Sequence, residues 1–326
     1  MPVLPAGFQP PLYFSNPHVQ TIGARFVRRV RAVPYERQRI TTVDGDFIDL
    51  DWIRGGHERV VIMLHGLESS TRAPHVQGLG RTLAADGWDV AAMNFRSCSG
   101  ESNKLLRSYH SGVTEDLAEV IQAVQARGDY PHVALVGFSL GGNVVMRYLG
   151  EQANHATALR IRMAAAVSVP MDLAACAETF TQPANQFYMK RFLRSLCAKV
   201  RTKRREYPDA IDYDAVLESK NFHDFDGRYT APVHGFDSAE HYWHSCSAST
   251  VASRIAVPTL MLNAMDDPFL TDSCHVHEIA ENSDHLFAEI SSCGGHVGFV
   301  RFGDEGRHYY ETRVRAFFRD HWQALP

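Results

Sequence analysis

The chain has 326 residues, of which 45% are hydrophobic and 21% are charged. These proportions are those of a globular protein, and the length suffices for one large α/β domain or two modest ones. With 33 basic and 37 acidic side chains the formal net charge is -4, so nothing in the charge points to a nucleic-acid-binding protein.

The N-terminal residues and the cysteines predict a cytoplasmic protein. Residues 1–18 show no cationic region followed by an apolar one, so we expect no signal peptide, and no apolar run approaches a membrane span. The six cysteines are scattered without a Cys-x-x-Cys pair, which is typical of reduced thiols. His275 and His277 are close in sequence but lack a third ligand at zinc spacing. We therefore expect neither a metal nor a cofactor.

Short apolar runs alternate with helical patterns along the chain, which predicts an α/β protein with a largely parallel sheet covered by helices. The polar and apolar residues of 47–53 alternate, so this first strand is predicted to be antiparallel. The further predicted strands cover 59–65, 88–95, 132–138, 162–170, 257–264 and 285–290. Predicted helices cover 73–87, 112–128 with Thr114 as a candidate N-cap, the segment that follows residue 138, and 306–323.

Residues 171–237 interrupt this alternation. Their composition is helical, charged and aromatic, without a strong strand. We interpret them as a helical lid inserted into a single domain that spans 1–326. Ligands of parallel sheets bind outside the carboxyl ends of the strands, which is where a lid inserted between a middle and a late strand would lie.

The sequence Gly-Phe-Ser-Leu-Gly at 137–141 matches the G-x-S-x-G pattern of a nucleophile elbow. Chance produces the pattern in roughly one chain of this length in ten, so the flanking sequence must decide whether the match marks a nucleophile. An apolar strand precedes it and a helical pattern follows, as the elbow requires. Gly137 and Gly141 let the strand and the helix approach, and Ser139 is then exposed at a helix N-terminus that favours negative charge. The alternative is an ordinary buried turn.

A nucleophilic serine needs a base and an acid, here in the chain order Ser, Asp, His. His296 lies in the glycine-rich stretch "GGHVGF" after the last predicted strand, and a hydrogen-bonded loop histidine is its alternative role. Asp266 and Asp267 follow the strand 257–264. We favour Asp267 as the acid, because Asp-Pro followed by an apolar residue resembles the acid loop of many hydrolases. Asp266 would then cap a helix that starts near Thr271 or bind loop backbone.

The oxyanion of such a reaction is bound by two backbone N–H groups. One belongs to the residue after the nucleophile, Leu140. The stretch "HGLESS" at 65–70 follows an earlier strand and supplies the second N–H, that of Leu67. A plain strand end at His65 and Gly66 is the alternative interpretation.

These residues resemble the YheT-like branch of the α/β-hydrolases, which includes the eukaryotic ABHD1/ABHD3-type lipid esterases and yeast medium-chain fatty acid ethyl ester synthases. The resemblance covers almost the whole chain in order. The matching stretches are "NPHVQT" (16–21), "DGDFIDLDW" (44–52), "HGLESS" (65–70), "NFRSCSGESN" (94–103), "YHSGVTEDL" (109–117), "GFSLGGN" (137–143), "FDGRYTAPVHGF" (225–236), "DDPF" (266–269) and "GGHVGF" (294–299).

The resemblance implies an α/β-hydrolase fold and a serine hydrolase that hydrolyses or transfers acyl groups from esters. We expect these to be short- to medium-chain or lipid-like esters. The resemblance also implies Ser139, Asp267 and His296 as the triad. Ser97 departs from the family, which usually has glycine there, but lies outside the triad. We interpret His18 and His110 as hydrogen-bonded scaffold residues, because the triad is complete without them.

Residues 185–208 are the most basic part of the predicted lid. Phe192, Leu193, Leu196 and Val200 fall on one helical face amid basic side chains. We favour packing of this face on the core of the lid, with the charges in water. Peripheral contact of this basic lid helix with an anionic membrane is the alternative.

Two other functions use the same fold. An alcohol O-acyltransferase would share the triad and differ in whether the lid excludes water. A non-catalytic binding protein would keep the fold without the chemistry, although relatives that lose activity usually lose a triad residue. The expected partner in the favoured function is a small-molecule ester, and the sequence does not predict an oligomeric state.

Overall fold

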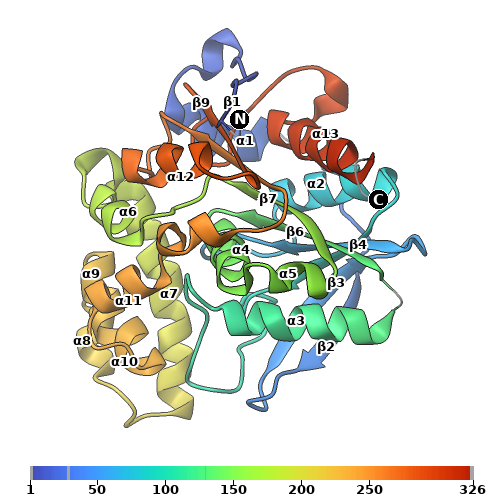
Figure 1. Cartoon of the computed structure of the whole chain (residues 1–326). Coiled ribbons are helices and arrows are strands. Elements are labelled where there is room, and N and C mark those ends of the chain that lie inside the picture. The colour runs from blue at the N-terminus through green and yellow to red at the C-terminus, as the bar shows by residue number, and fades with distance from the viewer. Residues whose placement is uncertain (1–2, 28–29, 129, 324–326) are drawn as a thin grey trace.

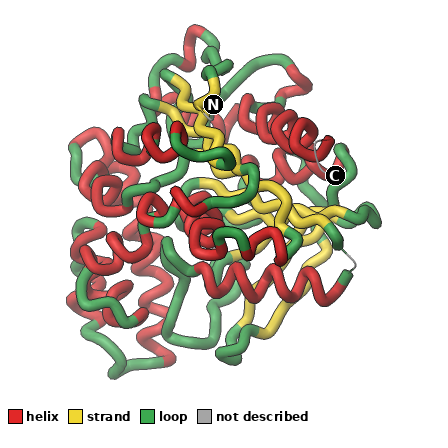
Figure 2. Tube along the Cα trace, viewed as in Figure 1, coloured by secondary structure: helices red, strands yellow, loops and turns green. Residues whose placement is uncertain are grey.

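A computed structural model of the chain describes residues 3–27, 30–128 and 130–323. Their strands form one nine-stranded sheet with helices on both faces (Figure 1, Figure 2). The strand order is β1-β9-β8-β7-β6-β4-β5-β3-β2. Neighbouring strands are parallel except in the pairs β2–β3 and β3–β5. The predicted fold class and the antiparallel strand at 47–53 are confirmed.

The strands are β1 Val3–Leu4, β2 Glu36–Thr41, β3 Phe47–Ile53, β4 Arg59–Leu64, β5 Asp89–Asn94, β6 His132–Phe138, β7 Ile161–Val167, β8 Thr259–Ala264 and β9 Leu286–Ser291. The helices around the sheet are α1 Pro17–Val27, α2 Pro74–Ala85, α3 Thr114–Arg127, α4 Leu140–Gln152, α5 His155–Ala158, α12 His277–Glu281 and α13 Tyr309–Gln323. Between β7 and β8 lie α6 Leu173–Thr179, α7 Gln186–Glu206, α8 Tyr213–Leu217, α9 Phe222–Phe225, α10 Ala231–His234 and α11 Ala239–Cys246. Every predicted strand and helix is present, with shifts of a few residues at the ends.

Beyond their first residues, the central strands β4 and β6 are apolar at every position because both of their faces are covered. In β4, Val60, Ile62 and Leu64 pack on the side of α3 and α4. Val61 and Met63 pack on the opposite side, with α2 and α13. All five side chains are buried. Strands covered on both faces have no room for polar chemistry along their length, so the functional groups lie in the loops at the strand ends.

The edge strands β1 and β2 and the helix α1 were not predicted. The sequence of β2 is Glu-Arg-Gln-Arg-Ile-Thr, and its charged side chains lack the apolar pattern by which strands are predicted. In the structure Arg37 and Arg39 pair with Asp51 and Asp49 of β3, each at 2.8 Å. Such cross-strand ion pairs suit an exposed edge strand, and the sequence pattern of β2 reflects that position.

The predicted N-cap of α3 is wrong. Val113 occupies the cap position, and no side chain caps the helix there. Thr114 is the first helical residue, and its hydroxyl donates to Glu151 Oε2 of α4 at 2.7 Å. Glu115 and Asp116 in the first turn supply negative charge to the free N–H groups instead.

The helices α6 to α11, which we call the cap helices, gather on one side of the sheet (Figure 1). They include the predicted helical segment 171–237, and helical structure continues to Cys246. Their apolar side chains form a core separate from the two cores of the sheet, with Met189, Leu193, Phe225 and Trp243 among its members.

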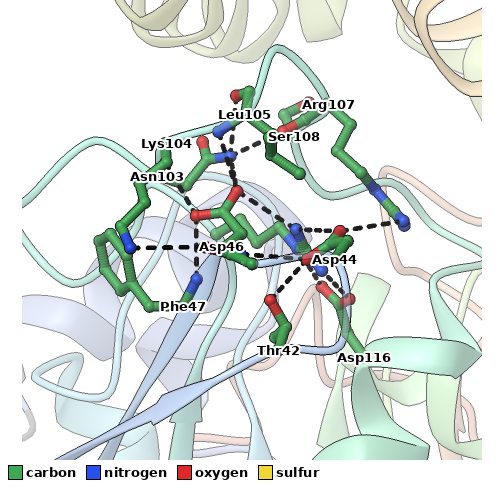
Figure 3. Close-up of polar contacts among 12 residues, drawn as sticks. Thr42, Asp44, Asp46, Phe47, Asn103, Lys104, Leu105, Arg107, Ser108 and Asp116 are labelled. Carbon is green, nitrogen blue, oxygen red and sulfur yellow. Dashed lines mark hydrogen bonds and ion pairs between the residues drawn. The ribbon is translucent and has the colours of Figure 1, made fainter.

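A buried ion cluster holds the β2–β3 turn, the loop after β5 and α3 together (Figure 3). The guanidinium of Arg96 donates to Asp116 at 2.7 and 2.8 Å, to Asp44 at 2.8 Å and to Asp46 at 3.2 Å. Asp46 also accepts from Asn103 Nδ2 at 2.6 Å. Three of the stretches that carry the family resemblance, 44–52, 94–103 and 109–117, therefore meet in one structural feature.

Substituting Arg96 by methionine should lower the free energy of unfolding by about 3–5 kcal/mol, because buried carboxylates would lose their counter-charge. Denaturant unfolding measures this loss. Arg204 pairs with Asp214 at the surface, so Arg204→Met should cost less than about 1 kcal/mol. A loss for Arg96→Met no larger than that of this control would contradict the structural role of the cluster.

Candidate active site

Ser139 lies at the sharp turn between β6 and α4. Its φ of 52° and ψ of -120° are a conformation that residues with side chains rarely adopt. A Cβ on Gly137 would lie 2.2 Å from the carbonyl oxygen of Gly141, and a Cβ on Gly141 would lie 2.5 Å from that of His65. Close backbone packing therefore requires glycine at both positions of the G-x-S-x-G pattern.

The loops after β8 and β9 bring the other two predicted triad residues to Ser139. His296 Nε2 lies 2.9 Å from Ser139 Oγ, and His296 Nδ1 lies 2.8 Å from Asp267 Oδ2. Because a carboxylate accepts hydrogen bonds, Nδ1 carries the hydrogen and Nε2 is free to accept from the hydroxyl. Asp267 is buried and also accepts the Phe269 N–H at 2.9 Å. The Phe269 ring packs on the imidazole, with the ring centroids 4.4 Å apart.

The two adjacent carboxylates of the acid loop point to different partners. Asp266 Oδ1 accepts the Gly295 N–H at 2.9 Å, from the loop that carries His296. Burial raises the pKa of Asp266. Asp266 thus binds loop backbone, which was one of its two predicted roles, while Asp267 faces the imidazole.

The helix α1 supports the loop that carries His296. Thr21 Oγ1 accepts the His296 N–H at 2.9 Å, and Gln20 Oε1, which is buried, accepts the Val300 N–H at 2.8 Å. Ser168 after β7 accepts the Val297 N–H at 2.9 Å. We did not predict these contacts. The stretch "NPHVQT" at 16–21 marked Gln20 and Thr21 only as part of the family resemblance.

Both predicted oxyanion donors lie close to Ser139, Leu140 as the next residue of the chain and Leu67 on the loop after β4. A Cβ on Gly66 would lie 3.1 Å from Ser139 Cβ, so the loop after β4 passes directly against the serine. Leu67 on this loop and Leu140 at the start of α4 line the same cavity as Ser139. Within the part of the chain that the structure describes, neither N–H is paired with an acceptor.

A buried histidine shapes this loop. His65 Nε2 accepts the Phe95 N–H at 3.2 Å, and Nδ1 donates to the Gly66 carbonyl at 2.8 Å. Burial lowers the pKa of His65 to about 4, so the ring stays neutral and keeps one donor and one acceptor. It therefore fixes the Gly66 carbonyl, and with it the peptide whose N–H belongs to Leu67.

The next residue of the loop, Glu68, is tied to the cap helix α7. Its carboxylate accepts from Lys199 Nζ at 2.6 Å, from the Tyr109 hydroxyl at 2.7 Å and from the Ser195 hydroxyl. Lys199 Nζ also lies 3.1 Å from the Sγ of Cys98, a thiol whose pKa burial raises to about 11. The Glu68 side chain is 3% exposed. The position of α7 and the geometry of the loop are thus linked.

A cavity of about 1050 Å³ opens from Ser139 and His296 into the cap helices. Apolar and aromatic side chains form most of its cap wall, among them Phe180, Phe192, Phe222, Phe225, Tyr229 and Trp243. This volume and lining suit a long apolar group that ends at the serine.

The helix α7 packs as we favoured from the sequence. Leu193 and Val200 are buried in the core of the cap helices. Phe192 and Leu196 are partly buried and line the cavity. The apolar face of α7 is therefore covered, and most of the basic side chains of this helix are exposed.

The two histidines interpreted as scaffold residues make structural contacts. His18 Nδ1 lies 3.1 Å from the Tyr188 hydroxyl, and the two rings are stacked. His110 is buried, and its Nδ1 accepts the Gly112 N–H at 3.1 Å. Burial holds the pKa of His110 well below its usual range, so this ring is neutral.

In the described ranges, no three His, Cys, Asp or Glu side chains are placed to hold a metal ion. All six cysteines are free thiols. Of the helices in these ranges, none combines the length and the hydropathy needed to cross a bilayer.

Known proteins with similar sequence cover most of the chain. YheT of Escherichia coli strain K12 is 36% identical over 306 residues, which are 90% of this chain and 87% of YheT. The mouse phospholipase ABHD3 is 26% identical, over 92% of this chain and 74% of its own length.

Comparisons of fold and family agree with this. The solved structure of the Pyrococcus furiosus esterase Pf2001 superposes with a TM-score of 0.58, at 21% identity, over 88% of this chain and 92% of that one. The profile of the α/β hydrolase fold family matches residues 59–301. On this match and on the similarity to YheT, the chain belongs to the α/β-hydrolase family.

Proposed function

We propose that this protein is a serine esterase that cleaves carboxylic esters through an acyl-enzyme. The observation that carries the proposal is the row of contacts from Ser139 Oγ through the His296 imidazole to the buried Asp267, at 2.9 and 2.8 Å, at the end of an apolar cavity. Such a row is the arrangement that activates a serine hydroxyl. The similarity to a protein named as a phospholipase supports ester hydrolysis.

In the proposed mechanism Ser139 Oγ attacks the ester carbonyl while His296 Nε2 takes its proton. Asp267 accepts the Nδ1–H hydrogen bond and stabilises the imidazolium. The N–H groups of Leu67 and Leu140 bind the oxyanion. The imidazolium then gives its proton to the leaving alcohol, and water activated by the same imidazole releases the acid from Ser139.

The substrate that we propose carries a medium-length or lipid-like acyl chain. The cavity is too large for an acetyl group alone, and aromatic side chains of the cap helices line the part beyond Ser139. Apolar burial is the main source of affinity in such a cavity, and each buried CH₂ contributes about 0.8 kcal/mol.

Replacing Ser139 by alanine should lower kcat for p-nitrophenyl esters by about 10⁶-fold, since the nucleophile is lost. Labelling by a fluorophosphonate probe should disappear as well. Ser111 also lines the cavity, so Ser111→Ala serves as a control that keeps labelling. Persistent labelling of Ser139→Ala would overturn the assignment of the nucleophile.

The two acid-loop carboxylates should differ sharply when each is made neutral. Asp267→Asn should lower kcat by about 10⁴-fold, because the amide no longer selects the correct imidazole tautomer. Asp266→Asn should cost about tenfold or less, because its amide oxygen can still accept the Gly295 N–H. Steady-state kinetics on one ester compare the two variants directly. Equal losses would argue against Asp267 as the partner of His296.

A series of p-nitrophenyl esters from acetate to palmitate should show kcat/KM rising by about fourfold per CH₂ until the cavity is filled. Leu196 lies in the cavity wall, so Leu196→Trp should move the optimum to shorter chains and leave acetate hydrolysis nearly unchanged. A profile that is flat in chain length, or that Leu196→Trp does not move, would contradict the proposed acyl site.

A further inference from the structure

The exposed side chains that line the cavity mark where it opens. Phe26 at the end of α1 is 73% exposed, and Phe187 at the start of α7 is 64% exposed. Both line the cavity together with Ile22, which is 41% exposed. The mouth of the cavity therefore lies between α1 and α7 and is framed by large apolar side chains in contact with water.

This apolar surface continues along α1. Val19, Ile22 and Phe26 recur at intervals of three and four residues, so they share one face of the helix. Residues 12–27 hold six of the ten most exposed large apolar side chains among the described residues: Leu12, Tyr13, Val19, Ile22, Phe26 and Val27. Single exposed apolar side chains are common on protein surfaces, but Ile22, Phe26 and Phe187 gather at one opening, which marks a contact site. We call these three side chains, together with Val19 on the same face of α1, the mouth surface.

The charges at the mouth are positive. Arg25, Arg72 and Arg191 line the cavity and are exposed. None of the three guanidinium groups has an ion-pair partner in the part of the chain that the structure describes. The acidic side chains in the cavity wall are occupied internally, since Glu68 binds Lys199 and Asp226 accepts from Thr230 and Trp243.

The next inference takes its biological meaning from the proposed ester hydrolase function, but it can be tested without measuring ester hydrolysis. We propose that the mouth surface docks on an anionic lipid surface, with the apolar face of α1 and Phe187 in the interface and the three arginines against acidic head groups. Basic residues near an anionic membrane attract it, and apolar side chains anchor the contact. A lipid ester would then enter the cavity directly from the bilayer.

Docking through α7 alone, or between two copies of the chain, fits the contacts less well. The apolar face of α7 is buried in the core of the cap helices, so α7 contributes Phe187 and Arg191 rather than an amphipathic face. A symmetric contact between two copies would bring each patch against itself. The unpaired arginines would then face like charges, which disfavours such a contact.

Vesicle co-sedimentation tests the proposal without any turnover, in a Ser139→Ala background that leaves the lipid intact. The protein should bind vesicles of phosphatidylglycerol and phosphatidylcholine, and bind phosphatidylcholine alone far less. Adding Arg25→Gln, Arg72→Gln and Arg191→Gln should weaken binding by about two orders of magnitude at low salt, since each basic residue contributes roughly fivefold. Adding Phe26→Ser and Phe187→Ser instead should weaken binding to both kinds of vesicle.

The matched control carries Val43→Ser and Arg127→Gln, two exposed positions away from the cavity lining, and should bind as the parent does. Circular dichroism shows whether each variant is folded.

Equal binding to anionic and to neutral vesicles would overturn the proposal, and so would equal effects of the mouth variants and the control on binding. So would a dimer in sedimentation velocity that Phe26→Ser and Phe187→Ser dissociate, because a second copy would then occupy the surface. If the parent protein does not bind anionic vesicles while the wild-type protein still hydrolyses p-nitrophenyl esters, docking alone is refuted and the proposed function stands.

Discussion

The site depends on how closely the turn after β6 packs against the end of β4. Side chains at Gly137 and Gly141 would overlap backbone atoms, so this packing admits only glycine at both positions. It holds Ser139 in a strained conformation at the N-terminus of α4, with its hydroxyl oxygen 2.9 Å from His296 Nε2. The loops after β4, β8 and β9 then reach the serine from strands of the same sheet, of which β4 pairs directly with β6. The packing of several strands thus maintains the strained backbone conformation of Ser139.

Sequence patterns predicted what is local. Central strands appear as apolar runs because both faces are buried, and the loops at their ends carried Ser139, Asp267 and His296 at recognisable positions. What the sequence could not predict depends on contacts between distant residues. Asp267 was favoured over Asp266 by resemblance to other acid loops alone, and the contact that gives Asp266 its separate role, with the Gly295 N–H, lies 29 residues further on. Edge strand β2 was missed because its charged side chains pair with those of β3. The N-cap of α3 was predicted wrongly because the Thr114 hydroxyl donates to Glu151 on α4 instead.

Buried polar pairs link parts of the chain that no local pattern connects. Glu68 and Lys199 are 131 residues apart, and the pair joins the loop with the Leu67 N–H to a cap helix. A buried carboxylate without a partner would be costly, so the loop keeps its shape only while α7 stays in place. The cap helices therefore enclose the cavity at Ser139 and also support the loop of the proposed oxyanion site.

The distribution of charge separates groups that hold the fold from groups that face outward. Arg96, Asp46 and Asp116 are buried and paired, and the buried carboxylate of Glu68 pairs with the partly exposed Lys199, as burial requires. Arg25, Arg72 and Arg191 are hydrated at the cavity mouth, where leaving a cation unpaired costs little, so they remain available to an external anion. The helix α1 has both roles, because part of it supports the site and part of it faces outward. Thr21 holds the backbone of His296, while Ile22 and Phe26 face the solvent. Any contact that moves α1 therefore acts on the loop that positions the imidazole.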